Sequence, residues 1–206
     1  MRGNGLVSGG LLPAARRGAT EAGLIEIADW YATFCGLAGV PAADPRAAAA
    51  GLPPVDSIDQ WPLLSGANAT PPRTEVVLGM PTVSSDNSIG NATLGVQALI
   101  RADGWKLIIG ETHQNVHTSP QYPNKSTHWP NSASDCGDGG CLFNVFTDPS
   151  EYEDVAAQHP DIAAARRARI AELNGTVYRP NRGANDGKAA CAKGLGEYKG
   201  FWGPWL

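Results

Sequence analysis

The sequence predicts an α+β fold in which a small, mostly antiparallel sheet packs against one C-terminal helix. Residues 96–110, "VQALIRADGWKLIIG", form two short apolar runs joined at Asp103-Gly104, and Asp-Gly is the dipeptide that a type I′ hairpin turn prefers. Residues 74–80 and 141–149 supply further strand candidates. Residues 159–173 begin with Pro160 in the first turn, where a missing N–H costs nothing, and predict the helix.

The composition argues against two classes of partner. Asp and Glu number 20 against 16 Lys and Arg, and no long basic run occurs, so we expect neither nucleic acid nor an anionic membrane as a partner. The longest apolar runs, such as "WKLII", fall far short of the ~20 residues that a membrane span needs. With 206 residues, the chain can bury the core of one large domain or two small ones.

Helical periodicity is clearest at the N-terminal side, in residues 24–38. At 100° per residue, five residues share the face that we expect to be buried: Leu24, Ala28, Tyr31, Cys35 and Ala38. The opposite face carries Glu26, Asp29 and Thr33. Before this helix, the glycine-rich residues 3–9 predict a strand edge in preference to a dinucleotide-binding loop, because no strand can precede them.

The segments between these elements predict loops. Residues 41–59 contain Pro53-Pro54 and predict a long surface loop that ends where "IDQWPLLSG" begins a short turn or helix, a plausible subdomain boundary. Residues 111–135 are rich in Pro, Asn, Ser and His and predict another long loop. In the C-terminal helix, Ile162, Ile170 and Leu173 lie on one face, and Arg166 on that face must either extend its charged end to the solvent or find a partner.

Cysteines and histidines give few candidates for chemistry. Cys136 and Cys141 bracket the flexible "GDGG", which favours a disulfide, whereas Cys191 has no obvious mate. His113 and His117 have the four-residue spacing of a zinc pair on a helix, but their surroundings are typical of a loop and contain no Glu between them. No motif for a nucleophile is present, so we expect no catalytic or metal-binding residue.

Four Asn-x-Ser/Thr sequons occur, at Asn68, Asn91, Asn124 and Asn174. Together with paired cysteines they favour the secretory pathway, with a lysosomal or extracellular destination. The N-terminal residues, "MRGNGLVSGGLLPAARRG", show no adequate signal peptide, so we expect the natural chain to begin earlier.

Several segments in a specific order resemble the C-terminal part of the arylsulfatase family. They are "IADWYATFCGLAG", "DSIDQWPLLSG", "PRTEVVLG", "DGWKLIIG", "CLFNVFTDPSEYEDVA" and the final "FWGPWL", and the similarity covers essentially the whole chain. The resemblance implies that residues 1–60 supply the last strand and helix of an alkaline-phosphatase-like α/β domain. Residues 61–206 would then form the C-terminal subdomain, with an aromatic tail that Cys191 anchors to the missing N-terminal domain.

The resemblance also implies where the chemistry of this family lies. Its nucleophile is a formylglycine made from the Cys of a Cys-x-Pro/Ala-x-Arg motif, which none of the four cysteines here matches. The calcium ligands of the family also precede these residues, and Asp86-Asn87 imitates them at the wrong place, so we expect no calcium on this chain. The 111–135 segment matches a variable loop at the pocket mouth, so His113, His117 or Trp129 are candidates for contact with a sulfated sugar, although we favour a loop that contacts only solvent.

The resemblance therefore predicts the C-terminal segment of a sulfuric ester hydrolase that is inactive as an isolated chain. A stand-alone glycosylated module remains as the alternative. Such a module would bind sulfated glycans or a partner protein with the same architecture.

Overall fold

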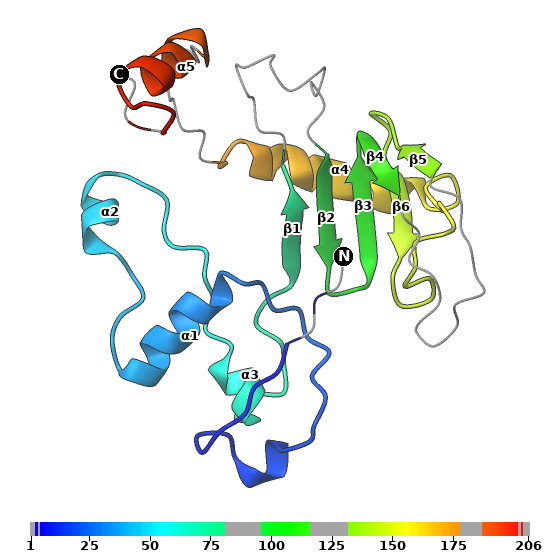
Figure 1. The fold of residues 1–206 in the computed structure, drawn as a ribbon. Coiled ribbons are helices and arrows are strands. Elements are labelled where there is room, and N and C mark those ends of the chain that lie inside the picture. Colours follow the sequence, from blue (N-terminus) through cyan, green and yellow to red (C-terminus); the bar gives the residue numbers. More distant parts are fainter. Residues whose placement is uncertain are drawn as a thin grey trace, which may run out of the picture.

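The computed structural model describes residues 3, 5–80, 96–115, 132–177, 187–201 and 203; for residues 111–115 and 132–135 it describes the backbone alone. The fold is α+β, as predicted. Its centre is a four-stranded antiparallel sheet in the order β1-β2-β3-β6 (Figure 1). The strands are β1 (Glu75–Gly79), β2 (Gln97–Arg101), β3 (Trp105–Ile109) and β6 (Cys141–Asn144).

The register of the sheet places one apolar row across all four strands. Val77 pairs with Leu99, Leu99 with Leu107, and Leu107 with Leu142. Because side chains alternate along a strand, this row points to one face of the sheet. Leu99, Leu107 and Leu142 are fully buried, so this face forms the core.

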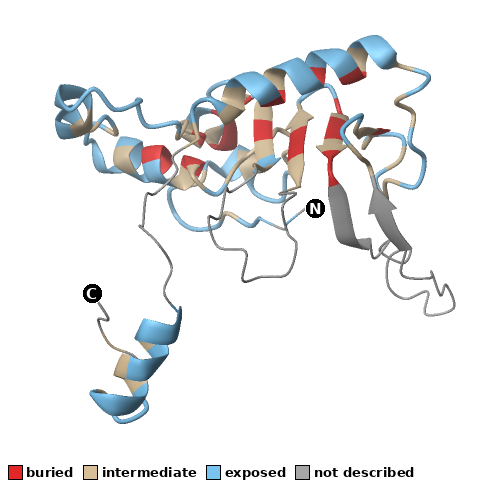
Figure 2. Ribbon diagram, turned by 90° about the horizontal axis from the view of Figure 1, so that it is seen from above, coloured by how far each residue is buried: buried red, intermediate tan, exposed pale blue. Residues whose placement is uncertain are grey.

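The helix α4 (Pro160–Asn174) covers that face (Figures 1 and 2). Ala163 and Ile170 join the strand leucines in one core cluster, and Ile162 and Leu173 pack against it, as predicted. The helix ends at Asn174, within one residue of the predicted end.

Arg166 lies on the same face of α4, and it is buried. Its guanidinium forms an ion pair with the carboxylate of Asp103 in the β2–β3 turn. Of the two predicted outcomes, Arg166 therefore finds a partner, in the turn that closes the hairpin.

The turn between β2 and β3 differs from the predicted two-residue type I′ turn. Gly104 N donates to Arg101 O at 2.9 Å, so Ala102 and Asp103 occupy the centre of the turn, and Gly104 follows with a φ of 83°. This is a three-residue loop with glycine in the left-handed region. Glycine is required at this position for two reasons. The φ is positive, and a Cβ there would lie 2.5 Å from the ring of Phe146.

The N-terminal part of the chain is built from short helices. They are η1 (Ala14–Arg16), α1 (Asp29–Ala38), α2 (Pro45–Ala49) and α3 (Trp61–Ser65). No strand precedes α1 among the described residues, so the Gly-rich strand edge is not found there. A strand needs a neighbouring strand to satisfy its backbone N–H and C=O groups, and no described strand pairs with this segment.

The predicted buried face of α1 is wrong. Tyr31 is 49% exposed, whereas Asp29 and Thr33, placed on the opposite face by the periodicity, have no exposed surface. The cause is tertiary, because buried polar groups on other segments bond to Asp29 and Thr33. The helix also begins at Asp29, five residues after the predicted start.

Three further elements are absent from the sequence predictions, and the first two of them lie in segments predicted as loops. Residues 45–49 form α2 because the Asp44 carboxylate caps the amides of Arg46 and Ala47 and because Pro45 suits the first turn. The 111–135 segment contains a separate two-stranded sheet of β4 (Glu111–Asn115) and β5 (Ser132–Asp135). Near the C-terminus, α5 (Gly187–Gly196) stands away from the sheet in Figures 1 and 2.

Candidate functional site

The residues predicted to contact a sulfated sugar are only partly located by the structure. His113 lies in the middle of β4, for which the backbone alone is described. His117 and Trp129 lie outside the described residues. The prediction that these residues contact a sulfated sugar stays untested.

Two of the four predicted sequons lie in the described part of the chain. Asn68 is exposed in the turn that follows α3, and Asn174 is the last residue of α4. Asn91 and Asn124 lie outside the described residues. The side chain of Asn68 accepts a hydrogen bond from Thr70 N at 3.0 Å, a local turn that leaves the sequon on the surface.

The predicted disulfide between Cys136 and Cys141 is present, with an S–S distance of 1.99 Å. It joins the end of the β4–β5 hairpin to the first residue of β6. Cys35 and Cys191 are free thiols, Cys35 half-buried and Cys191 exposed. Cys35 is therefore less enclosed than the periodicity predicts.

A buried polar cluster joins α1, the segment before α3 and the start of β1. Its centre is the carboxylate of Asp29, which forms a two-point ion pair with the guanidinium of Arg73: Arg73 Nε donates to one oxygen at 2.7 Å and Nη2 donates to the other. Gln60 Nε2 donates to the same carboxylate at 2.9 Å, and so does the amide of Ile58. Asp29 and Gln60 have no exposed surface.

Two more residues complete this cluster. Thr33 Oγ1 donates to Asp29 O at 2.7 Å and accepts from Gln60 N at 2.9 Å, so the hydroxyl ties the helix to the segment before α3. Glu26 Oε2 lies 3.3 Å from Arg73 Nη1. We call Glu26, Asp29, Thr33, Gln60 and Arg73 the Asp29 cluster.

The pKa values of the two carboxylates in the Asp29 cluster shift in opposite directions. Burial raises the pKa of Asp29, but the hydrogen bonds from Arg73 and from the amides of Glu26 and Ile58 outweigh burial and hold it below 3.8. Burial raises the pKa of Glu26 above 4.5, with Arg73 opposing. The hydrogen bond to Asp29 raises the pKa of Arg73, so this residue stays charged.

This arrangement is suited to holding the fold and not to proton transfer. A carboxylate with a lowered pKa and a permanently charged guanidinium do not exchange protons near neutral pH. Among the described residues, no group of three His, Cys, Asp or Glu side chains could hold a metal ion. We derive no catalytic step for the Asp29 cluster.

The sequence patterns missed this cluster because they treated Asp29 as a solvent-facing residue. A signal was present all the same. Asp29 is the first residue of a helix, and Arg73 lies two residues before a strand. Side chains at both positions can reach neighbouring segments. Only the tertiary pairing of Asp29 with Arg73, 44 residues apart, identifies them as partners.

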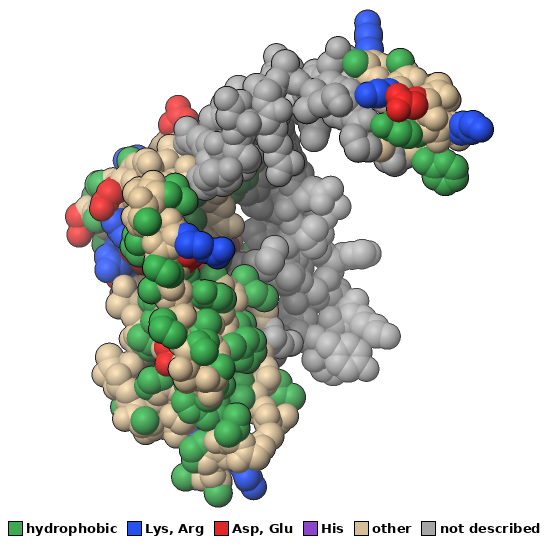
Figure 3. Space-filling model, turned by 90° about the vertical axis from the view of Figure 1, so that its left-hand side faces the viewer, with side chains coloured by type: hydrophobic (Ala, Val, Ile, Leu, Met, Phe, Trp, Pro, Cys, Tyr) green, Lys and Arg blue, Asp and Glu red, His purple; other side chains and the backbone are tan. Residues whose placement is uncertain are grey.

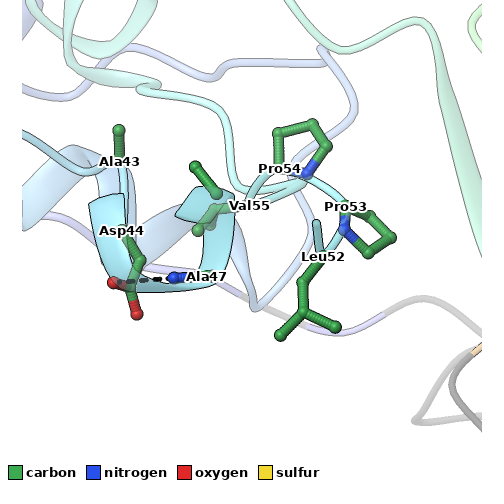
Figure 4. A pocket seen from close by; sticks show the side chains of 8 residues that line it. Ala43, Asp44, Ala47, Leu52, Pro53, Pro54 and Val55 are labelled. Carbon is green, nitrogen blue, oxygen red and sulfur yellow. Dashed lines mark hydrogen bonds between the residues drawn. The ribbon is translucent and has the colours of Figure 1, made fainter. Parts of the chain in front are cut away.

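An open pocket of about 270 Å³ lies between α2 and the chain that follows it (Figure 4). Its lining is mostly apolar: Ala43, Asp44, Ala47, Ala48, Leu52, Pro53, Pro54 and Val55. The single charged side chain is that of Asp44, and its carboxylate is occupied in capping α2.

The outer face of α1 is apolar and exposed. Ile27, just before the helix, is 86% exposed, and Phe34 within it is 61% exposed. The rings of Trp30 and Phe34 stack at 5.7 Å. Figure 3 shows hydrophobic side chains gathered on the face of the molecule that carries α1 and α2. No helix in the described part of the chain has the length and apolar character to cross a bilayer.

Comparisons with known proteins find a distant structural similarity. No family model matches the sequence. A solved structure from Bacteroides thetaiotaomicron, described under the metabolism of multiple glycosaminoglycans by that organism and labelled 6S-sulf, is 20% identical to this chain with a TM-score of 0.42. The match covers 71% of this chain and 24% of the other, so the chain spans about a quarter of that protein's length.

Proposed function

We propose that this chain is the C-terminal portion of a sulfuric ester hydrolase of the arylsulfatase family. The proposal rests on the ordered segments that resemble this family, and the finer resemblance of those segments is to arylsulfatase B, N-acetylgalactosamine-4-sulfatase. Its substrates would accordingly be sulfated sugars or aryl sulfates. The large N-terminal domain of such an enzyme would be the partner of this chain.

One structural observation carries the proposal. Three of the resembling segments, "IADW", "DSIDQW" and "PRTEVV", are separated in the sequence, yet each contributes a residue to the Asp29 cluster, namely Asp29, Gln60 and Arg73. Their side chains meet with almost no exposed surface. Segments that resemble one family in order and that also depend on one another in the fold support a shared architecture more strongly than isolated matches.

The chemistry of the complete enzyme would lie outside these residues. In the family, a formylglycine attacks sulfur, and calcium neutralises the charge of the sulfate. None of the four cysteines here lies in a Cys-x-Pro/Ala-x-Arg motif. The chain by itself is therefore proposed to be inactive and to contribute structure to the enzyme.

The test is a direct assay of the isolated chain with an aryl sulfate in the presence of calcium. We expect no more phenol release than from a heat-denatured sample of the same chain. A formylglycine-containing sulfatase run beside it shows that the assay works. Turnover by the folded chain above the denatured control would overturn the proposal.

A second candidate is a stand-alone glycosylated module that binds a partner protein or a sulfated glycan. The exposed apolar face of α1 favours the partner protein, because a contiguous apolar surface is typical of an interaction site. The coding sequence upstream of Met1 separates the two candidates. A continuous frame with a Cys-x-Pro-x-Arg motif supports the enzyme, and a stop codon or a new signal peptide supports the module.

We further propose a secretory, lysosomal or extracellular location. The disulfide between Cys136 and Cys141 supports it, because such bonds persist in oxidising compartments. The exposed sequon at Asn68 supports it as well.

A further inference from the structure

We propose that the Cys136–Cys141 disulfide is a redox-sensitive anchor for the β4–β5 hairpin. Reduction of this bond would release the hairpin from the end of β3 while the four-stranded sheet stays folded. The inference rests on backbone geometry and does not depend on the proposed enzymatic family.

The β4–β5 hairpin has little to hold it in place by itself. In the described residues, its two strands pair with each other and not with the larger sheet, and the register is interrupted between Thr112 and Asn115. Their sequences, "ETHQN" and "SASD", contain no alternation of apolar residues that could form a core. A two-stranded hairpin of this kind is marginally stable in water, so its order depends on its connection to the rest of the molecule.

The hairpin is connected to the sheet at Gly110, between β3 and β4, by a few backbone hydrogen bonds. Gly110 N donates to Gly137 O at 3.0 Å, and Cys136 N donates to Gly110 O at 3.2 Å. Gly140 N donates to Cys136 O at 2.8 Å, which closes the tight loop back toward β6. The disulfide spans this loop and ties the returning end of the hairpin to Cys141.

The covalent bond is needed because the loop between the two cysteines is intrinsically loose. Residues 137–140 read "GDGG", and glycine populates more backbone conformations than any other residue. Gly137 and Gly140 both have positive φ values, of 51° and 77°. Without the disulfide, the entropy of this loop would be opposed by noncovalent contacts such as these backbone hydrogen bonds and the one that Arg167 of α4 donates to Gly139 O.

The four-stranded sheet has independent support, so it should survive reduction. Cys141 pairs with Ile108 across the β3–β6 ladder, and Leu142 is buried against Leu107. On the outer side of β6, Val155 N donates to Leu142 O at 2.9 Å, and the Asp154 carboxylate accepts from Leu142 N at 2.9 Å. These contacts do not involve the sulfur atoms.

The redox step is a thiol–disulfide exchange with a dithiol reductant. A thiolate of the reductant attacks one cysteine sulfur, the Cys136–Cys141 bond breaks, and a mixed disulfide forms while the other cysteine leaves as a thiolate. The second thiol of the reductant then displaces the remaining cysteine. The reductant leaves as a cyclic disulfide, and the two cysteines take up the two protons as thiols.

Hydrogen–deuterium exchange of the whole chain tests the inference, before and after treatment with a dithiol. The chain carries Cys35→Ser and Cys191→Ser, so that no other thiol contributes. We expect backbone amides in residues 111–115 and 132–136 to exchange at least about tenfold faster after reduction, because the covalent bond that limits opening at this end of the hairpin is gone. The amides of Leu99, Leu107 and Leu142 should keep their protection.

A matched variant provides the second measurement. Cys136→Ser with Cys141→Ser should show the fast exchange without reductant and no further response to it. Unchanged exchange in the hairpin after complete reduction would overturn the proposal. So would loss of protection in the hairpin and the four-stranded sheet together, because the bond would then support the whole fold and not the hairpin.

Discussion

Five hydrogen bonds converge on the carboxylate of Asp29, which is completely buried. Every one of these donors is an N–H group, so an ionised carboxylate satisfies all of them and a neutral amide cannot. The residue therefore acts as the fixed point to which α1, the segment before α3 and β1 are attached.

Replacing Asp29 with Asn should destabilise the chain severely. The change keeps the shape of the side chain but leaves the buried charge of Arg73 with the partly exposed Glu26 in place of its two-point partner, and breaking a buried ion pair costs about 3–5 kcal/mol. The free energy of unfolding in urea measures the loss. The control is Arg46→Ala, which removes the exposed ion pair with Asp44 and should cost less than about 1 kcal/mol. Equal effects of the two variants would contradict this view of the Asp29 cluster.

The same carboxylate should make stability depend on acid pH. The folded-state pKa of Asp29 is lowered, so its contribution is complete above the unfolded-state pKa of about 3.9 and is lost as the pH falls through the folded-state value. Urea unfolding between neutral pH and acid should show a fall that Asp29→Asn reduces.

Glu26 should change the dependence of stability on pH in the opposite direction. Its pKa is raised in the folded state, so protonation of Glu26 adds stability as the pH falls through that raised value. Glu26→Gln should therefore steepen the loss of stability on acidification. A curve that neither variant changes would show that other groups control the acid transition.

At the scale of the elements, most of the sheet and α4 could be predicted from the sequence. The strands around Asp103-Gly104 and the helix from Pro160 were found because their signals are local: apolar runs, a turn dipeptide and a proline in a first turn. The face of α1 could not be predicted, because the partners of Asp29 and Thr33 lie on segments that no local pattern connects to the helix. The β4–β5 strands were missed because their sequences, "ETHQN" and "SASD", are polar and show no apolar alternation.

The β2–β3 turn gives a test of an element by one substitution. Gly104→Ala should destabilise the chain by more than about 1 kcal/mol, because alanine is strained at a φ of 83° and its Cβ meets Phe146. Thermal or urea unfolding measures the change.

The matched control for this turn is Gly139→Ala, because a Cβ there has no heavy atom within 4 Å. This change should leave stability within about 0.5 kcal/mol. Adding Phe146→Ala to Gly104→Ala should restore the part of the loss that is due to contact and leave the backbone strain. A Gly104→Ala chain as stable as the control would contradict the observed turn.

At the scale of the whole molecule, a single core under α4 supports the sheet, and its centre is the leucine row. Leu142→Ala should cost about 2–5 kcal/mol, because the side chain is completely buried and leaves a cavity. Leu195→Ala in α5 removes the same atoms from a residue that is 75% exposed, and it should be close to neutral. Calorimetric unfolding of the two variants compares them; equal losses would place the core elsewhere.

The candidate site was less predictable than the fold. The disulfide followed from two cysteines at close spacing around glycines, which is a local pattern. The Asp29 cluster did not follow, because it needs three segments whose spatial relation only the folded chain supplies. The prediction of the disulfide did not depend on the family resemblance.

The position of Gln60 in the Asp29 cluster has a practical consequence for anyone who dissects this chain. A cut after residue 60, where the sequence suggests a subdomain boundary, would leave Asp29 and Gln60 on one fragment and Arg73 on the other. Each piece would then expose an unmatched charge that had been sealed from water. Expression of residues 1–60 and 61–206 as separate proteins is therefore a poor strategy. Split-reporter or limited-digestion studies should avoid cutting the chain at this point.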